Sequence, residues 1–186
     1  MSGASVEDRF VVSLEERIRE RIRDVPDFPR PGITFKDITP LLTDAALLRD
    51  VVARMAEVAQ DLRIDVVAGI ESRGFIFGAP VALAIGAGFT PLRKPGKLPH
   101  RTLRVDYELE YGTDALEAHM DGVLAGQRVL LIDDVLATGG TAAGGRRLIQ
   151  QLGGDVIAAG FLLELGFLAG RERLGDLALH ALVRYD

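Results

Sequence analysis

The stretch RVLLIDDVLATGGTAAGG, residues 128–145, decides how the rest of the chain is organised. It opens with the apolar run Val129–Ile132, and two adjacent carboxylates, Asp133 and Asp134, follow directly. A continuous run of Val, Leu and Ile is typical of a strand that is buried on both faces in a parallel sheet. In open α/β sheets, ligands bind at the carboxyl ends of such strands. The two acids are therefore predicted to lie at a ligand site.

The residues after the acids form a turn rich in Gly and Thr, ahead of a helix predicted over 141–152. Main-chain N–H groups in such a turn can converge on an anion, and the N-terminus of the following helix adds its positive dipole end. The phosphate-binding candidates are Ala137, Thr138, Gly139, Gly140 and Thr141. A cradle of this kind beside carboxylates that can accept from sugar hydroxyls predicts a ribose phosphate ligand.

Length and composition predict an ordinary globular domain. The chain has 186 residues, of which 48% are hydrophobic and 26% charged, and its formal charge is -5. The negative charge argues against binding to a nucleic acid backbone. The absence of cysteine excludes disulfides, thiolate metal sites and a thiol nucleophile. We see neither a secretion signal nor an apolar run of about 18 residues, so we expect a cytoplasmic protein without membrane contact.

Hydrophobic periodicity predicts helices and strands that alternate along the chain. Ser13 and Glu16 form a capping-box pattern at the first helix. Helices are predicted over 13–25, 44–62, about 74–85 and 141–152, and strands over 65–70, 89–94, 107–111, 116–120, 155–165 and 179–185. The alternation favours an α/β fold with a mainly parallel twisted sheet flanked by helices. Pro91 predicts that the 89–94 strand lies at a sheet edge.

Two segments contain prolines and glycines that exclude a helix over most of their length. Residues 25–42, VPDFPRPGITFKDITPLL, suit a binding lid and a structured connector equally well. Residues 93–104 hold five basic side chains, which taken alone are typical of a solvated loop. Because this basic segment follows a strand end, it is also a candidate for a mobile lid over a polyanion.

Arg73 lies in ESRGFIFG, between a predicted buried strand and an apolar helix. A charged side chain there is costly unless it meets an acid or an anionic ligand. The two readings are an ion pair with Glu71 or another acid, and contact with a ligand at the strand end.

Four ordered stretches resemble the type I phosphoribosyltransferases. VLLIDDVLATGGT is similar to the motif with which this family binds phosphoribosyl pyrophosphate, and alone it indicates only the superfamily. PDFPRPGITFKDITPLL, ESRGFIFG, and RKPGKLPHRT followed by YELEYG resemble segments of adenine phosphoribosyltransferases in the same order. The matches span about residues 26–143, and GRERL at 170–174 extends them. Motifs of this length and order are far more specific than a lone Gly-rich turn.

The resemblance implies Mg2+-dependent transfer of the phosphoribosyl group to N9 of adenine, which gives AMP and pyrophosphate in purine salvage. It implies that Asp133 and Asp134 bind the ribose hydroxyls and stabilise the positive charge that grows on the ring. Glu110 resembles the acid/base residue that handles the purine proton. The implied catalytic residues are thus Glu110, Asp133 and Asp134.

The other implied contacts form two groups. The base contacts are Phe28, Thr34 and Arg73. The pyrophosphate contacts are Glu71, Ser72, Arg93, Lys94 and Lys97. Lys36 lies where some relatives have Arg. Whether this position makes the bidentate hydrogen bond that an arginine could make is therefore an open question.

The resemblance further implies the type I phosphoribosyltransferase fold in a single domain over residues 1–186, with a small hood from about 25–42 and a mobile lid loop from about 95–110. It implies a homodimer. Mg2+ is expected mainly through substrate oxygens, with no protein ligand assigned. Transfer to another purine such as xanthine or hypoxanthine is the close alternative. A purine-sensing regulator is a further alternative, but it normally needs a DNA-binding domain, and only about 25 residues precede the matched region.

Overall fold

The computed structural model describes residues 12–108 and 112–186, and the chain forms two compact units that divide between Asp50 and Val51. The elements before the division are α1 (Leu14–Arg21), β1 (Arg23–Val25), β2 (Phe35–Asp37) and α2 (Thr39–Leu42). The division falls within α3 (Ala45–Ala59).

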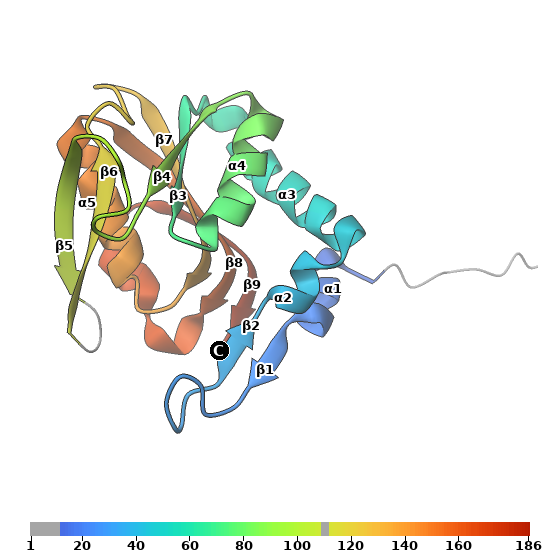
Figure 1. The fold of residues 1–186 in the computed structure, drawn as a ribbon. Helices are drawn as coiled ribbons and strands as arrows, with labels where there is room; N and C mark the ends of the chain where they lie inside the picture. Colours follow the sequence, from blue (N-terminus) through green and yellow to red (C-terminus); the bar gives the residue numbers. More distant parts are fainter. Residues whose placement is uncertain (1–11, 109–111) are drawn as a thin grey trace, which may run out of the picture. The chain divides into compact units, whose positions relative to one another are not determined.

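The second unit carries the central sheet and is shown with the rest of the chain in Figure 1. Its helices are α4 (Gly74–Ile85) and α5 (Gly140–Leu152), with short 3-10 helices η1 (Gln60–Leu62), η2 (Gly166–Leu168) and η3 (Gly170–Leu174). Its strands are β3 (Val66–Ile70), β4 (Gly88–Leu92), β5 (Thr102–Glu108), β6 (Thr113–His119), β7 (Arg128–Leu136), β8 (Asp155–Leu165) and β9 (Ala178–Tyr185).

The first unit begins with the predicted capping box. The Ser13 side chain accepts from the Glu16 N–H at 3.2 Å, and Glu16 Oε2 accepts from the Ser13 N–H at 2.8 Å. The helix ends at Arg21, earlier than the predicted Val25, because Arg23–Val25 pair antiparallel with β2. Within the segment 25–42, regular structure is confined to Val25, Phe35–Asp37 and Thr39–Leu42, so most of it is irregular, as predicted. The turn between the two strands is closed by Phe28 N–H, which donates to the Ile33 carbonyl at 3.1 Å.

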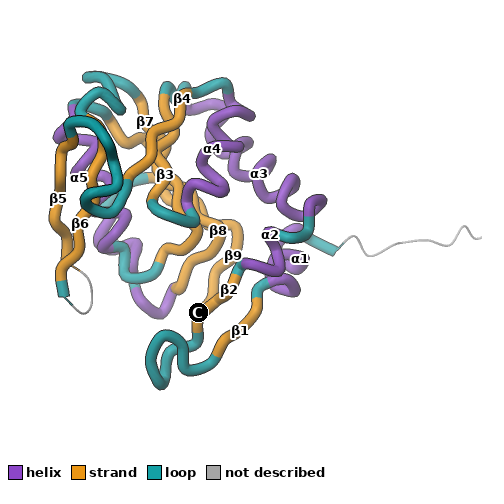
Figure 2. Tube along the Cα trace, viewed as in Figure 1, coloured by secondary structure: helices purple, strands orange, loops and turns teal. Residues whose placement is uncertain are grey.

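Five parallel strands form the central sheet in the order β4-β3-β7-β8-β9, which confirms the predicted parallel sheet and the edge position of β4. Figure 2 shows these strands in orange beside one another. All five residues of β3 are buried, as are Val129–Ile132 of β7. Because the strands are parallel, the residues that follow β3, β4 and β7 lie together at the carboxyl end of the sheet.

Helices α4 and α5 cover opposite faces of this sheet (Figure 1). On the α5 face, Leu148 and Ile149 pack with Ala68 and Ile70 of β3 in the main hydrophobic cluster. On the other face, Gly69 leaves room for the rings of Phe75 and Phe89. Helix α5 ends at Gly153 with φ +95°, a conformation in which Gly is favoured. These helices fix the main chain that leaves β3 and β7.

Strands β5 and β6 form a separate antiparallel hairpin, which packs on α5. The strands predicted over 107–111 and 116–120 correspond to β5 and β6, but β5 starts at Thr102 and takes in seven residues of the segment assigned to the lid. The reason is alternation: Val105 and Tyr107 face the core while Arg104 and Asp106 are exposed. Among the described residues, no helix is long and apolar enough to cross a membrane.

Candidate active site

Asp133 and Asp134 belong to the last four residues of β7, at its carboxyl end. Asp134 is buried, with 3% of its surface exposed. The Asp133 Oδ1 accepts from the Asp134 N–H at 2.9 Å, and Asp134 Oδ2 lies 2.9 Å from Arg73 Nε. The start of α4 packs directly against this part of β7: a Cβ on Gly74 would lie 2.6 Å from the Ile132 carbonyl oxygen.

Both acids hold protons more tightly than ordinary aspartates. Burial, together with the neighbouring charge of Asp134, raises the pKa of Asp133 well above its usual value. Burial also raises the pKa of Asp134, although the Arg73 guanidinium opposes that rise. One cation facing two acids leaves the pair short of positive charge. Hydroxyl donors, or positive charge that develops on a sugar ring, would supply what is missing.

The predicted phosphate cradle is a real turn at the N-terminus of α5. Gly139 has φ +78° and directly precedes the first helical residue, Gly140. A small cavity of about 60 Å³ is lined by Asp133 and by every residue of Ala137–Thr141. The turn and one of the acids thus share one cavity.

The cradle is held from outside by the GRERL segment. A Cβ placed on Gly170 would overlap the Ala137 carbonyl oxygen, and one placed on Gly139 would overlap the Gly170 carbonyl oxygen. The two stretches of main chain are therefore in direct contact, at a distance that only glycine allows. The family resemblance includes GRERL but implies no role for Gly170. No local pattern reveals a contact between such distant positions.

Glu71 follows β3 and collects basic groups from the segment after β4. Its Oε1 lies 2.8 Å from Lys97 Nζ, and its Oε2 accepts from Arg93 Nε at 3.2 Å and from the Lys94 N–H at 2.9 Å. The side chain is 10% exposed. Burial would raise the pKa of Glu71, but the hydrogen bonds from Lys97, Lys94 and Arg93 outweigh it and lower that pKa.

The structure thus brings together four of the five residues assigned to pyrophosphate, with one qualification. Arg93, Lys97 and the main chain of Lys94 meet at Glu71, whereas the Lys94 side chain points to the hairpin. The fifth, Ser72, is exposed just before α4, and its peptide bond with Glu71 is cis.

Arg73 pairs with Asp134, not with Glu71. Its Nε to Asp134 Oδ2 distance is 2.9 Å, and its side chain is 36% exposed. The two readings of Arg73 are compatible, since the ion pair holds this side chain at the carboxyl end of β7, where a ligand is predicted.

The remaining base candidates are in the first unit. Phe28 is 51% exposed, and its ring packs edge-on against Phe35 with centroids 5.3 Å apart. Thr34 is also exposed. Glu110 lies outside the described residues.

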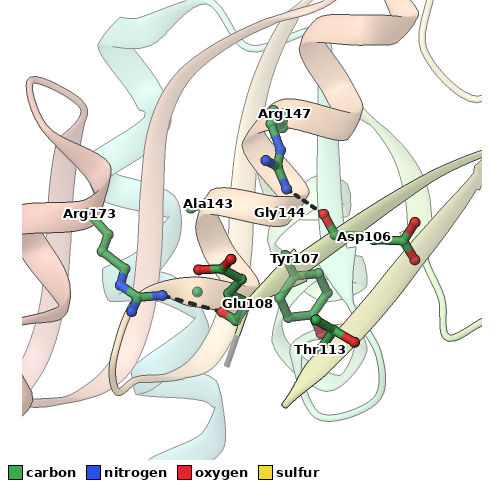
Figure 3. A pocket seen from close by; sticks show the side chains of 9 residues that line it. Asp106, Tyr107, Glu108, Thr113, Ala143, Gly144, Arg147 and Arg173 are labelled. Atoms are coloured by element: carbon green, nitrogen blue, oxygen red, sulfur yellow. Dashed lines mark hydrogen bonds between the residues drawn. The ribbon is translucent and has the colours of Figure 1, made fainter. Parts of the chain in front are cut away.

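A larger cavity, of about 560 Å³, lies where the hairpin meets α5, and Figure 3 shows its lining. Arg147 Nη2 donates to the main-chain carbonyl of Asp106 at 2.5 Å, and Arg173 Nη1 donates to that of Glu108 at 3.3 Å. Two arginines from different elements thus brace β5. Sequence analysis missed both arginines. A hydrogen bond to a main-chain carbonyl far away in the chain produces no pattern in the residues that flank the arginine.

Comparison with known proteins agrees with this geometry. The family described as phosphoribosyl transferase domain matches residues 40–166. The adenine phosphoribosyltransferase of Anaeromyxobacter sp. (strain Fw109-5) is 56% identical over 170 residues, which cover 91% of this chain and 96% of that protein. The enzyme of the same name from Thermobifida fusca (strain YX) is 56% identical over 161 residues, covering 87% and 92% respectively.

Solved structures show the same likeness. The crystal structure of adenine phosphoribosyltransferase from Thermoanaerobacter pseudethanolicus has a TM-score of 0.90 at 50% identity, covering 93% of this chain and 100% of that one. The Saccharomyces cerevisiae enzyme, complexed with an imino-altritol bisphosphate and adenine, has a TM-score of 0.85 at 36% identity, covering 92% and 99%.

A parallel sheet that ends in paired acids and a Gly-rich turn, with basic groups gathered at the next strand, agrees with the phosphoribosyltransferase class that the family match indicates. The chain belongs to the phosphoribosyltransferase family and, within it, groups with the adenine phosphoribosyltransferases.

Proposed function

We propose that this protein transfers the 5-phosphoribosyl group from phosphoribosyl pyrophosphate to adenine, giving AMP and pyrophosphate. The observation that carries the proposal is the cavity shared by Asp133 and Ala137–Thr141. A ribose 5-phosphate carries hydroxyls and a phosphate on one small molecule. Its binding site therefore needs a hydroxyl acceptor such as Asp133 close to an anion-binding turn such as Ala137–Thr141. The protein's high identity to adenine phosphoribosyltransferases supports adenine as the acceptor.

In this proposal the donor half of the site is the end of β7. Main-chain N–H groups of Ala137–Thr141 and the hydroxyls of Thr138 and Thr141 hold the 5'-phosphate at the N-terminus of α5. Asp133 and Asp134 accept from the ribose hydroxyls. When the bond from the anomeric carbon to pyrophosphate breaks, positive charge grows on the ring, and these two carboxylates stabilise it.

The leaving pyrophosphate meets the basic groups around Glu71. The Arg93 and Lys97 side chains are 32% and 51% exposed, so both retain surface that a ligand can reach. Glu71 and Ser72 shape this part of the site. Because Glu71 is already ionised in its cluster, it keeps the two cations in place before the ligand arrives.

The donor set of the chain fits Mg2+ carried by the substrate. The described residues include no group of three or more His, Asp or Glu side chains that could hold a metal ion. Mg2+ is commonly bound by substrate phosphates with one or two carboxylates and several waters. We expect the ion to be held mainly through substrate oxygens, and we assign no protein ligand to it. The ion supplies neutralisation of the pyrophosphate charge.

For the acceptor, we propose that Arg73 contacts the purine from its position beside Asp134, with Phe28 and Thr34 as further base contacts. Glu110 remains the proposed acid/base residue for the purine proton. Residues 25–42 as hood, residues 95–110 as lid, a single functional domain, a homodimer and a cytoplasmic location likewise remain predictions.

The deciding experiment supplies phosphoribosyl pyrophosphate and Mg2+ with adenine, hypoxanthine, guanine or xanthine in parallel. We expect AMP and pyrophosphate with adenine, and turnover with the oxopurines at least 100-fold lower. Product is measured by chromatography. Turnover with an oxopurine but not adenine would replace the acceptor in the proposal while leaving the donor half intact.

A further inference from the structure

Lys94 joins two parts of the second unit. Its main-chain N–H donates to Glu71 Oε2 at 2.9 Å, within the basic cluster that follows β3 and β4. Its side chain leaves that cluster. The ammonium donates to Tyr107 Oη at 2.9 Å and to the carboxylate of Asp114. A lysine that is itself one of the proposed pyrophosphate contacts is thus held by two residues with no assigned role.

The two acceptors are themselves firmly placed. Tyr107 on β5 and Asp114 on β6 are direct cross-strand partners, so their side chains share one face of the hairpin. Tyr107 is 4% exposed, and its ring packs against α5 so closely that a Cβ on Gly144 would lie 2.7 Å from it. Asp114 Oδ1 accepts from the Ala115 N–H at 2.7 Å, which orients the carboxylate.

The hairpin is also fixed to the strand that precedes Lys94. Arg93 and Glu117 exchange main-chain hydrogen bonds of 2.8 and 2.7 Å. The Lys94 main chain therefore has little freedom, and the position of its ammonium is set by Tyr107 and Asp114.

The ammonium keeps capacity for a ligand. A lysine ammonium has three donors, and among the described residues two are used, by Tyr107 and Asp114. The side chain is 35% exposed. Burial would lower the pKa of Lys94, but the hydrogen bonds with Asp114 and Tyr107 raise it, so the group stays charged at neutral pH. One N–H of a charged, oriented group is left for an anion.

We propose that Asp114 and Tyr107 are positioning residues for the transfer reaction: they hold the Lys94 ammonium so that its third N–H binds a pyrophosphate oxygen. This inference rests on the proposed function for the nature of the anion. A fixed donor binds better than a free lysine, because the conformational entropy of its long side chain is already lost before the ligand binds.

The test is a set of mutant cycles read by calorimetric binding of magnesium pyrophosphate. The variants are Asp114→Asn, Tyr107→Phe and Lys94→Met, singly and with each acceptor change combined with Lys94→Met. We expect Asp114→Asn to weaken binding about tenfold and Tyr107→Phe about threefold. In the Lys94→Met background neither change should matter further, because both act through the ammonium. The KM for the donor should rise in parallel, with kcat at saturation within about twofold.

Asp106→Asn is the matched control, since its carboxylate lies on the same hairpin and accepts from the exposed Arg104. It should bind pyrophosphate as the wild type does, and thermal unfolding of every variant checks that the fold is intact. Tighter binding by Asp114→Asn would overturn the proposal, because Asp114 would then compete with the ligand for Lys94. An equal loss with and without Lys94 would also overturn it. A wild type that binds pyrophosphate but makes no AMP from adenine refutes the proposed acceptor and leaves this cycle readable.

Discussion

Two neighbouring strands end in partly buried carboxylates that differ in their surroundings. Glu71, after β3, gathers Arg93, Lys97 and the Lys94 N–H, and its pKa is lowered. Asp133, at the end of β7, has Asp134 as its nearest charge, and its pKa is raised. The first carboxylate is a built-in counter-ion that organises cations for an anionic ligand. The second lacks such cations, and in the proposed function the substrate hydroxyls supply its partners.

The two ends also differ in what holds them. Side-chain ion pairs organise the β3 end, whereas the β7 end combines one ion pair, between Arg73 and Asp134, with main chain packed through Gly74, Gly139 and Gly170. Added volume should therefore disturb the β7 end in particular.

The largest effect is expected from removing both charges at β7. Asp133→Asn combined with Asp134→Asn should lower turnover by about 10²–10³-fold, because the two groups that we propose to stabilise the developing positive charge become neutral. Steady-state kinetics of AMP formation measures this loss. Normal kinetics would mean that the charge of the pair has no part in the reaction.

Added volume at Gly170 should come next. Gly170→Ala places a methyl group against the Ala137 carbonyl, and overpacking of this kind costs about 1–3 kcal/mol. We expect roughly a tenfold to hundredfold loss of affinity for ribose 5-phosphate, measured by calorimetry. Gly88→Ala is the control, since its Cβ would meet nothing closer than 3.6 Å. Equal affinities of Gly170→Ala and Gly88→Ala would show that the cradle does not depend on this contact.

A smaller effect is expected at the β3 end. Glu71→Gln removes the counter-ion of Arg93 and Lys97 and should lower the free energy of unfolding at pH 7 by about 1 kcal/mol, because both cations are partly exposed. The folded-state pKa of Glu71 is lowered, so its stabilisation is present above the ordinary value of 4.5 and is lost as the pH falls through the folded-state pKa. Urea unfolding at pH 7 and pH 3 should show a smaller difference between variant and wild type at pH 3 than at pH 7.

The smallest effect should have the opposite sign. The folded-state pKa of Asp133 is raised, so its ionisation weakens folding as the pH rises through that pKa. Asp133→Asn should therefore raise the melting temperature at pH 8 by roughly 2–4 °C, while activity falls. Asn can still accept from the Asp134 N–H, so the local hydrogen bond is kept. Thermal unfolding at pH 3, where wild-type Asp133 is protonated, should show no gain.

Local sequence signals predicted the β7 end almost residue by residue. The apolar run, the acids and the Gly-rich turn are adjacent in the chain, and each has its own physical meaning. Parallel pairing and the edge position of β4 followed from composition and from Pro91 in the same way. What sequence could not provide was contact between distant residues. Tyr107 and Asp114 read as ordinary hairpin residues, and only the cross-strand register and the direction of Lys94 give them a role.

The hydrogen bonds of Arg147 and Arg173 to β5 were hidden for the same reason. The start of β5 was missed differently. The basic residues of 93–104 favoured a lid loop, although the alternation of apolar and polar residues that is typical of a strand already begins at Leu103.

The contact between Gly139 and Gly170 has a consequence for how the protein is made. A ribosome adds about 5–20 residues per second, so Gly170 is joined to the chain roughly two to six seconds after Gly139. During that interval both aspartates and the phosphate turn exist, but the main chain that braces the turn has not been synthesised. The proposed donor site is therefore among the last parts of the molecule to become complete, and a nascent chain that stops short of η3 contains the Asp133–Thr141 stretch without the main chain that supports it.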